Sequence, residues 1–129
     1  MLKDHEIEQL FVELALPEEA RQLVRFARAN SPVRDANSRL GNSIVWHFSR
    51  KMGNRHLEVE SRTVEGPAAT TYENDPSCLE FWPQPCRVDL VIKDENGKII
   101  SRKQHTPDFL LIRQDGIYIH EWREEARLM

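Results

Sequence analysis

The sequence predicts an α+β domain in which helices flank a mixed β-sheet, in the manner of three-layer α/β proteins. Two observations lead to this fold class. Apolar residues recur at helical spacing through residues 1–30, whereas residues 44–123 consist mainly of short apolar runs separated by turn signals. One further helical stretch, residues 63–76, interrupts the strands. The chain has 129 residues, enough for one domain with a modest hydrophobic core.

Residues 1–35 are expected to form an N-terminal helical segment that precedes the sheet. Pro17 interrupts the helical pattern and suits the first turn of a second helix, with Glu18 and Glu19 at the favourable end of its dipole. Asn30-Ser31-Pro32 ends that helix. The apolar positions of the two helices are Ile7, Leu10, Phe11, Leu14, Leu23, Val24, Phe26 and Ala27.

Three arginines of the second helix recur at spacings of four and three residues and therefore share one face. They are Arg21, Arg25 and Arg28. Two interpretations are open at this point. The arginines either line a solvated helix face or form a stripe that contacts phosphate groups.

Residues 36–129 are expected to form the main domain, which opens with strands at residues 44–48 and 56–62. The second of these strands alternates apolar and polar residues, as a half-buried strand does. The turn between the two strands contains three cations, Arg50, Lys51 and Arg55. This turn is either an ordinary solvated hairpin or a contact to a DNA backbone.

The helix expected within residues 63–76 begins best with Gly66 as its cap and Pro67 at its first helical position. Glu65 then lies where the preceding strand passes into the helix. The extended segments expected after this helix comprise residues 79–82, 87–92, 98–102, 109–112 and 117–123. Asn96-Gly97 and Asp115-Gly116 are the tight-turn signals between them.

Two acids lie on adjacent strands of the last hairpin. Asp108 precedes the apolar run of residues 109–112, and Glu121 lies near the end of the returning strand. Arg123 follows two residues after Glu121 and shares its face, because side chains of a strand repeat every second residue. Magnesium prefers oxygen ligands, so this pattern is typical of a divalent-metal site. Alternatively, Asp108 caps a turn after Pro107, and Glu121 pairs with Arg123 or with Arg113.

Two histidines flank these acids, and we expect both to be structural or surface residues. His105 could instead orient a metal ligand or contact a phosphate. His120 lies on the opposite face of the strand from Glu121, which makes it a poor ligand. Gln84, between two prolines, is given a structural role.

Composition narrows the class of protein. The net charge of -3 provides no global basic field for nucleic acid, which is weak counter-evidence against DNA binding because the acidic metal sites of nucleases offset their basic flanks. The two cysteines, Cys78 and Cys86, make neither a disulfide framework nor a zinc signature, and we expect two reduced thiols. The sequence has no apolar run that could span a bilayer and no signal peptide, so we expect a cytoplasmic protein without a membrane partner.

Short motifs across residues 40–125 resemble, in their order and spacing, the N-terminal endonuclease domain of the transposon protein TnsA and of TnsA-like proteins. The motifs include Ser49-Arg50-Lys51-Met52-Gly53, Glu60-Ser61-Arg62-Thr63-Val64-Glu65, Tyr72-Glu73-Asn74-Asp75, Phe81-Trp82-Pro83-Gln84-Pro85, His105-Thr106-Pro107-Asp108-Phe109 and Glu121-Trp122-Arg123. This family belongs to the restriction-endonuclease-like superfamily, whose signature is Pro-Asp followed by (Asp/Glu)-x-Lys. Here Pro107-Asp108 and Glu121-Trp122-Arg123 match the two halves, and Glu65 matches the position of a further acid.

The resemblance implies a restriction-endonuclease-like fold and a metal-dependent DNA endonuclease that cuts transposon ends. Asp108, Glu121 and Glu65 would bind Mg²⁺, for which Mn²⁺ can substitute, and Arg123 would complete the catalytic set. The implied partners are double-stranded DNA at transposon ends, a DDE transposase subunit and an AAA+ regulator in a bacterial cytoplasm. Arg50, Lys51, Arg55 and His105 are the candidate DNA contacts. The domains of this superfamily usually continue past the last motif, so we expect a chain cut from a longer protein.

Arg123 departs from the family pattern, which has lysine at this position. An arginine cannot act as a base in a protein because its pKa stays above about 12. It can still present a fork of N–H groups to a phosphate and stabilise developing charge. Two hypotheses therefore follow from the sequence: an active endonuclease in which Arg123 is purely electrostatic, or a nuclease-fold module that binds DNA or a transposase without cutting.

Overall fold

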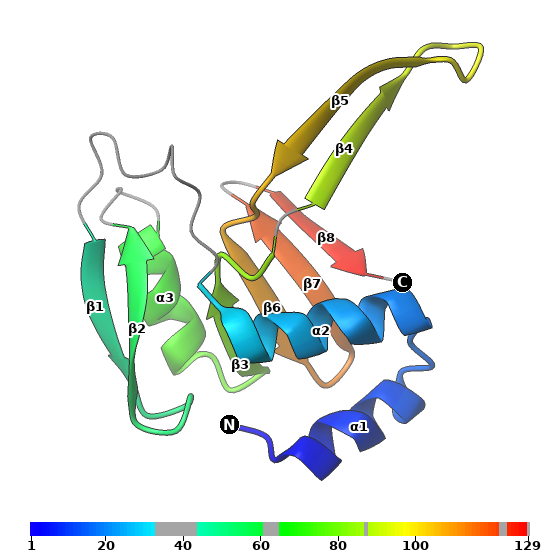
Figure 1. Ribbon diagram of the computed structural model, residues 1–129. Helices are drawn as coiled ribbons and strands as arrows, with labels where there is room; N and C mark the ends of the chain where they lie inside the picture. The colour runs from blue at the N-terminus through cyan, green and yellow to red at the C-terminus, as the bar shows by residue number, and fades with distance from the viewer. Residues whose placement is uncertain (33–43, 61–64, 87, 122–123, 129) are drawn as a thin grey trace.

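The computed structural model describes residues 1–32, 44–60, 65–86, 88–121 and 124–128 (Figure 1). Three helices and eight strands follow one another in these ranges. The helices are α1 (Asp4–Glu13), α2 (Glu18–Asn30) and α3 (Glu65–Asn74). The strands are β1 (Ile44–Ser49), β2 (Arg55–Glu60), β3 (Cys78–Pro83), β4 (Val88–Lys93), β5 (Ile99–His105), β6 (Phe109–Arg113), β7 (Gly116–Glu121) and β8 (Glu124–Leu128). The α+β class expected from the sequence is confirmed.

The two N-terminal helices form where the apolar spacing predicts them. The side chains that they bury are Ile7, Leu10 and Phe11 on α1 and Ala20, Val24 and Ala27 on α2. Pro17 is the residue immediately before α2, where its missing N–H is not needed. The expectation that Phe26 lies on the apolar stripe is wrong, because 46% of this residue is exposed. Val24 and Ala27 already fill the buried face of the helix.

The third helix begins at Glu65, one residue before the expected cap. Gly66 and Pro67 therefore lie inside its first turn. Proline is tolerated there because the first N–H groups of a helix have no intrahelical acceptor. Glu65 thus lies at the N-terminus of α3, where the helix dipole favours an acid.

The main sheet has the strand order β3-β6-β7-β8. Two separate pairs, β1 with β2 and β4 with β5, form two-stranded sheets. Every pairing among the described strands is antiparallel, in contrast to the mixed sheet that we expected from the sequence. Most of these pairs are joined by short turns, which permit only antiparallel neighbours.

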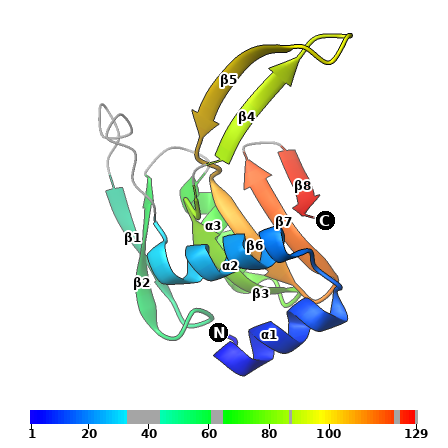
Figure 2. The same ribbon diagram turned by 45° about the vertical axis from the view of Figure 1, so that its right-hand side comes forward.

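Helices pack on both faces of the main sheet. On one face, Glu80 of β3 is bonded to Arg28 of α2, and α2 crosses the sheet in both views (Figures 1 and 2). On the other face, the ring of Tyr72 in α3 contacts Phe81 and Phe109 at centroid distances of 5.8 and 5.1 Å. Apolar side chains therefore cover the sheet from both sides, which explains the continuous burial of Phe109–Ile112.

The β4–β5 hairpin projects away from the rest of the chain as a ribbon (Figures 1 and 2). Its turn is closed by the side chain of Asp94, which accepts hydrogen bonds from the amides of Asn96 and Lys98, both at 2.9 Å. Gly97 adopts a positive φ of 81° there, as the sequence signal predicts. Within the described residues, no helix is long and apolar enough to cross a membrane.

Candidate functional site

Asp108 and Glu121 lie at the same end of the β6–β7 hairpin. The last register pair at this end joins Phe109, the first residue of β6, to His120. Asp108 precedes this pair in a bend, and Glu121 follows it as the last residue of β7. The hairpin therefore brings the backbones of the two acids to the same end of the sheet.

The backbone of Asp108 is held by the segment that follows β3. The amide of Gln84 donates to the carbonyl oxygen of Asp108 at 2.8 Å. Gln84 adopts a positive φ of 43°, between two prolines that have no amide of their own to donate. The structural role expected of Gln84 is confirmed, since it fixes the backbone at the entry to β6.

Glu65 begins α3 at the same end of the sheet. The C-terminal end of α3 is tied to the start of β3, where the amide of Cys78 donates to the carbonyl of Asp75 at 3.1 Å. Cys78 in turn pairs with Arg113 at the far end of β6. The N-terminus of α3 therefore points toward the beginning of β6, and Figure 1 shows the same direction.

The structure describes the side chain of Asp108, which is half-buried, but not those of Glu65, Glu121 and His105. Arg123 lies entirely outside the described residues. Among the side chains that are described, no group of three or more His, Cys, Asp or Glu residues could hold a metal. The metal set of Asp108, Glu121 and Glu65 thus stays a prediction from the sequence and the backbone register.

His120 packs away from this end of the hairpin. Its ring contacts that of Tyr72 at a centroid distance of 5.4 Å and an interplanar angle of 79°. His120 thus packs against α3, whereas its orientation relative to the side chain of Glu121 stays a prediction. His105 ends β5, three residues before Asp108, so the projecting ribbon returns to the body of the protein beside the acids.

The basic turn between β1 and β2 lies at the other end of α3. The ammonium group of Lys51 donates to the carbonyl oxygens of Tyr72 and Asp75, both at 2.6 Å. Tyr72 belongs to the last turn of α3, a helix of ten residues that spans about 15 Å, and Asp75 directly follows the helix. Lys51 is thus bound within the protein, at the end of α3 that is remote from Glu65.

The other two cations of this turn differ from Lys51. Arg50 is exposed. The guanidinium carbon of Arg55 lies 5.5 Å from the centroid of the Trp82 ring, within the range of a cation–π contact. Only Arg50 and Arg55 therefore remain as candidate contacts for an outside anion among the three cations of the turn.

Each of the three arginines of α2 bonds to a group within the protein, and Arg25 is also exposed to solvent. The Nε atom of Arg21 donates to the carbonyl of Leu16 at 2.9 Å. Arg25 pairs with Glu8 on α1 through two bonds of 2.9 Å. The Nε atom of Arg28 donates to the carboxylate of Glu80 in β3 at 3.0 Å. All three side chains are engaged in contacts that hold the helices in place.

Glu80 is a buried acid that the sequence patterns did not single out. Its side chain is fully buried and accepts hydrogen bonds from the Nε atom of Arg28, the Nε1 atom of Trp82 and the backbone amide of Leu2, at 3.0, 2.9 and 2.8 Å. The signal that could have found it is a lone acid within the apolar run Leu79–Trp82. Because every one of these donors is internal, Glu80 joins the N-terminus and α2 to the sheet and is not a candidate ligand.

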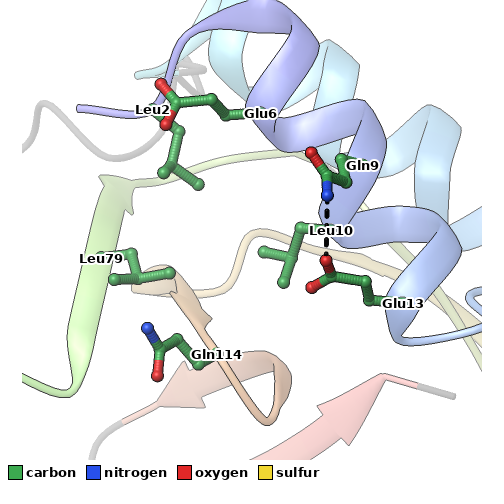
Figure 3. A pocket seen from close by; sticks show the side chains of 7 residues that line it. All are labelled: Leu2, Glu6, Gln9, Leu10, Glu13, Leu79 and Gln114. Atoms are coloured by element: carbon green, nitrogen blue, oxygen red, sulfur yellow. Dashed lines mark hydrogen bonds between the residues drawn. The ribbon is translucent and has the colours of Figure 1, made fainter.

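A hollow between α1, β3 and the β6–β7 turn is remote from the acids. Figure 3 shows Glu6, Gln9 and Glu13 around it, with Leu10 and Leu79 lining it. Gln114, which also lines it, follows the end of β6, whereas Asp108 precedes the beginning of that strand. A strand of five residues spans about 17 Å, so this hollow is not part of the acidic end of the sheet.

Comparison with known protein families found no family model that matches this chain, and a search of curated proteins found no match. The function of this chain is therefore inferred from its own residues.

Proposed function

We propose that this chain is a metal-dependent DNA endonuclease domain that resembles the TnsA-like family and cuts phosphodiester bonds at transposon ends. The observation that carries the proposal is that Asp108 and Glu121 directly flank the last β6–β7 register pair, Phe109 and His120. Glu65, the third carboxylate of the proposal, begins α3, which packs on the face of the sheet that carries Phe109 and His120. A main sheet with helices on both faces is also consistent with the restriction-endonuclease-like, three-layer fold implied by the resemblance.

The chemistry of these residues fits a hard divalent cation. Asp108, Glu121 and Glu65 offer only carboxylate oxygens, which suit Mg²⁺ or Mn²⁺, and two or three carboxylates are the number that Mg²⁺ usually accepts. When bound, such a cation polarises a phosphate oxygen and supplies a water nucleophile at neutral pH. In this proposal Asp108 and Glu121 hold the first cation, and Glu65 holds a second one directly or through water.

Arg123 would contact the scissile phosphate. Its guanidinium can donate two parallel hydrogen bonds to phosphate oxygens and so orient the phosphate and offset its charge. It cannot remove a proton from the attacking water. An active site built on this residue therefore depends on the cations for the nucleophile and on Arg123 for charge stabilisation.

The second candidate function is a nuclease-fold module that binds DNA or a transposase subunit without cutting. The replacement of the usual lysine by Arg123 favours it, because this is the residue that departs from the family pattern. The two candidates share the fold and the expected partners. They differ in whether Asp108 and Glu121 bind a metal.

Metal-dependent thermal stability tests the proposal directly. A ligand that binds only the folded state stabilises it by RT ln(1 + [L]/Kd), which at about 10 mM Mg²⁺ and a Kd of about 1 mM is about 1.4 kcal/mol. For a domain of this size the melting temperature should rise by about 5 °C. The Asp108→Asn and Glu121→Gln variants should lose this shift.

The Glu95→Gln variant is a suitable control, because Glu95 is an exposed acid in the β4–β5 turn. It should keep the full metal shift. A wild-type protein without any shift in Mg²⁺ or Mn²⁺, or one whose shift survives in Asp108→Asn, would contradict the metal site and favour the binding module.

A further inference from the structure

The outer face of the β1–β2 hairpin presents a continuous group of aromatic rings to solvent. Trp46 is 62% exposed and Phe48 is 48% exposed. The ring of His56, from the neighbouring strand, lies between them, with its centroid 6.5 Å from that of Trp46 and 5.2 Å from that of Phe48. We call Trp46, Phe48 and His56 the aromatic face.

The strand register explains why these three rings share one side. Phe48 pairs with His56, and Trp46 pairs with Glu58. These four residues share one side of the hairpin, because successive side chains of a strand point to opposite faces. The inward positions of β2, Leu57 and Val59, are buried in the core. The hairpin therefore needs its inner face for folding, whereas the aromatic face contributes little to the described core.

An exposed cation follows the aromatic face along the chain. Arg50 directly follows β1 and is exposed. Its neighbour Lys51 is bonded to the end of α3 and is not available. Glu58, at the opposite edge from Phe48, is half-buried. An exposed positive charge therefore lies two residues after Phe48, where β1 enters the turn.

We propose that the aromatic face is a stacking platform for the unpaired bases of a single-stranded nucleic acid, with Arg50 contacting its phosphates. Exposed Trp and Phe rings on a strand, beside a cation, are the groups on which such proteins stack bases. An apolar protein partner fits this face less well, because Glu58 and His56 interrupt the apolar surface. A nucleobase has a flat apolar face and a polar edge, so it tolerates these polar neighbours.

This inference does not depend on the endonuclease proposal. The aromatic face is built from β1 and β2, whereas the proposed metal ligands belong to α3 and the β6–β7 hairpin. Base stacking needs no metal, so binding should persist in EDTA. It should also persist in the Asp108→Asn variant, in which the proposed metal site is removed.

Fluorescence anisotropy with labelled 12-nucleotide DNA and RNA strands, in EDTA and at low salt, tests the platform. Loss of one stacked base weakens binding by about 5- to 150-fold, so Trp46→Ala and Phe48→Ala should each raise Kd within that range. Trp46→Phe, which keeps a ring, should recover most of the affinity. A duplex of the same sequence should bind with an affinity that Trp46→Ala does not change, because its bases are already stacked.

The matched control is Phe26→Ala, since Phe26 is exposed to a similar degree, 46%, but lies on α2. Its affinity for the single strand should equal that of the wild type. Each variant should keep the wild-type melting temperature within a few degrees, because all of these rings are exposed. The DNA and RNA arms identify which strand is preferred.

Three results would overturn the inference. The wild type could fail to bind either strand, or Trp46→Ala could bind as well as the wild type. The third is a concentration-dependent dimer, seen by sedimentation, that Trp46→Ala dissociates while single strands do not bind. That last result would assign the aromatic face to a protein partner.

Discussion

Arg28 and Glu80 form a buried ion pair between α2 and the central sheet. Their Nε and Oε1 atoms are 3.0 Å apart, and their side chains are 10% and 0% exposed. A second arginine nitrogen, Nη2, lies 3.3 Å from Oε2 of the same carboxylate. Arg28 also donates to the carbonyl of Leu2 at 2.6 Å. The pair thus connects three segments that are far apart in the sequence.

Removal of one member of this pair should be strongly destabilising. Glu80→Ala leaves the guanidinium of Arg28 and the indole N–H of Trp82 without their buried acceptor, which typically costs about 3–5 kcal/mol. The double variant Arg28→Met/Glu80→Met should lose less than either single variant, because no buried charge remains unpaired. Urea unfolding measures these free energies.

The exposed pair of Arg25 and Glu8 provides the control, with side chains 42% and 48% exposed. Its disruption by Glu8→Ala should change the unfolding midpoint only slightly, because solvent screens such pairs. Equal losses for Glu80→Ala and Glu8→Ala would show that the buried pair has no special role in stability.

Lys51 and Arg50 are neighbours in sequence with different expected effects. Lys51→Met removes the donor to two carbonyls at the end of α3, and loss of such charge-assisted bonds costs about 1.5–3 kcal/mol. Arg50→Met should change the unfolding free energy by less than about 0.5 kcal/mol, since its side chain is exposed. Denaturation of both variants tests this difference, and a Lys51→Met variant as stable as Arg50→Met would contradict it.

Glu73 should make stability depend on acidity. Burial alone would raise the pKa of Glu73, but hydrogen bonds from the Ser49 hydroxyl, the Lys51 amide and His47 outweigh it and hold this pKa below its ordinary value. The carboxylate therefore stabilises the fold above the ordinary pKa, and this contribution is lost as the pH falls through the lowered one. The difference in unfolding free energy between wild type and Glu73→Gln should shrink on acidification below about pH 4. A difference that does not change with pH would exclude this role.

Cys78 should be an inert thiol. Burial raises its pKa to about 11, and burial also raises the pKa of Cys86. Because the thiolate is the reactive species, both thiols should react with Ellman's reagent at pH 8 only after unfolding. Rapid reaction of the native protein would contradict this prediction.

The free energy of unfolding should also fall as the pH rises from 9, the ordinary pKa of a cysteine thiol, toward 11, the pKa of Cys78 in the folded protein. The reason is that the thiol loses its proton in the unfolded chain at a lower pH than in the folded one.

Local patterns in the sequence predict much of this fold. Helical spacing locates α1 and α2, and Asp115-Gly116 predicts the β6–β7 hairpin. The location of Asp108 and Glu121 at one end of this hairpin follows from the hairpin alone. A short turn fixes the register of its two strands, whose last pair is Phe109 and His120. The candidate site is therefore predictable to the extent that it is local.

Long-range partners are not encoded in such patterns. The pairing of β3 with β6, and the contact of Arg28 with Glu80 across 52 residues, depend on how the elements pack. The strand β8 was not expected either, since Glu124–Leu128 has no apolar alternation and is ordered by its pairing with β7. The same holds for Lys51, whose acceptors Tyr72 and Asp75 lie at the end of α3, beyond the intervening strand β2.

The substitution of Arg123 separates the two candidate functions. If the domain cuts DNA with Arg123 as a charge stabiliser, Arg123→Lys should preserve or raise nicking of transposon-end DNA, because the ammonium places the family's usual group at the same position. Arg123→Ala should lose about 10²–10³ in rate, the usual scale for one electrostatic stabiliser. Asp108→Ala should abolish cutting, since a metal ligand is lost. Glu95→Gln, in the β4–β5 turn, is the control and should leave the chemical step unchanged.

The assay needs full transposon-end sequences, Mg²⁺ or Mn²⁺ and the transposase partner, because enzymes of this kind are expected to be silent alone. Binding of the same DNA is measured in parallel, so that a loss of cutting is distinguished from a loss of binding. If wild type and Arg123→Lys both bind DNA or the partner in the complete mixture but neither cuts, the nuclease proposal fails. The binding module then follows, because the fold and its partner contacts persist where the reaction does not.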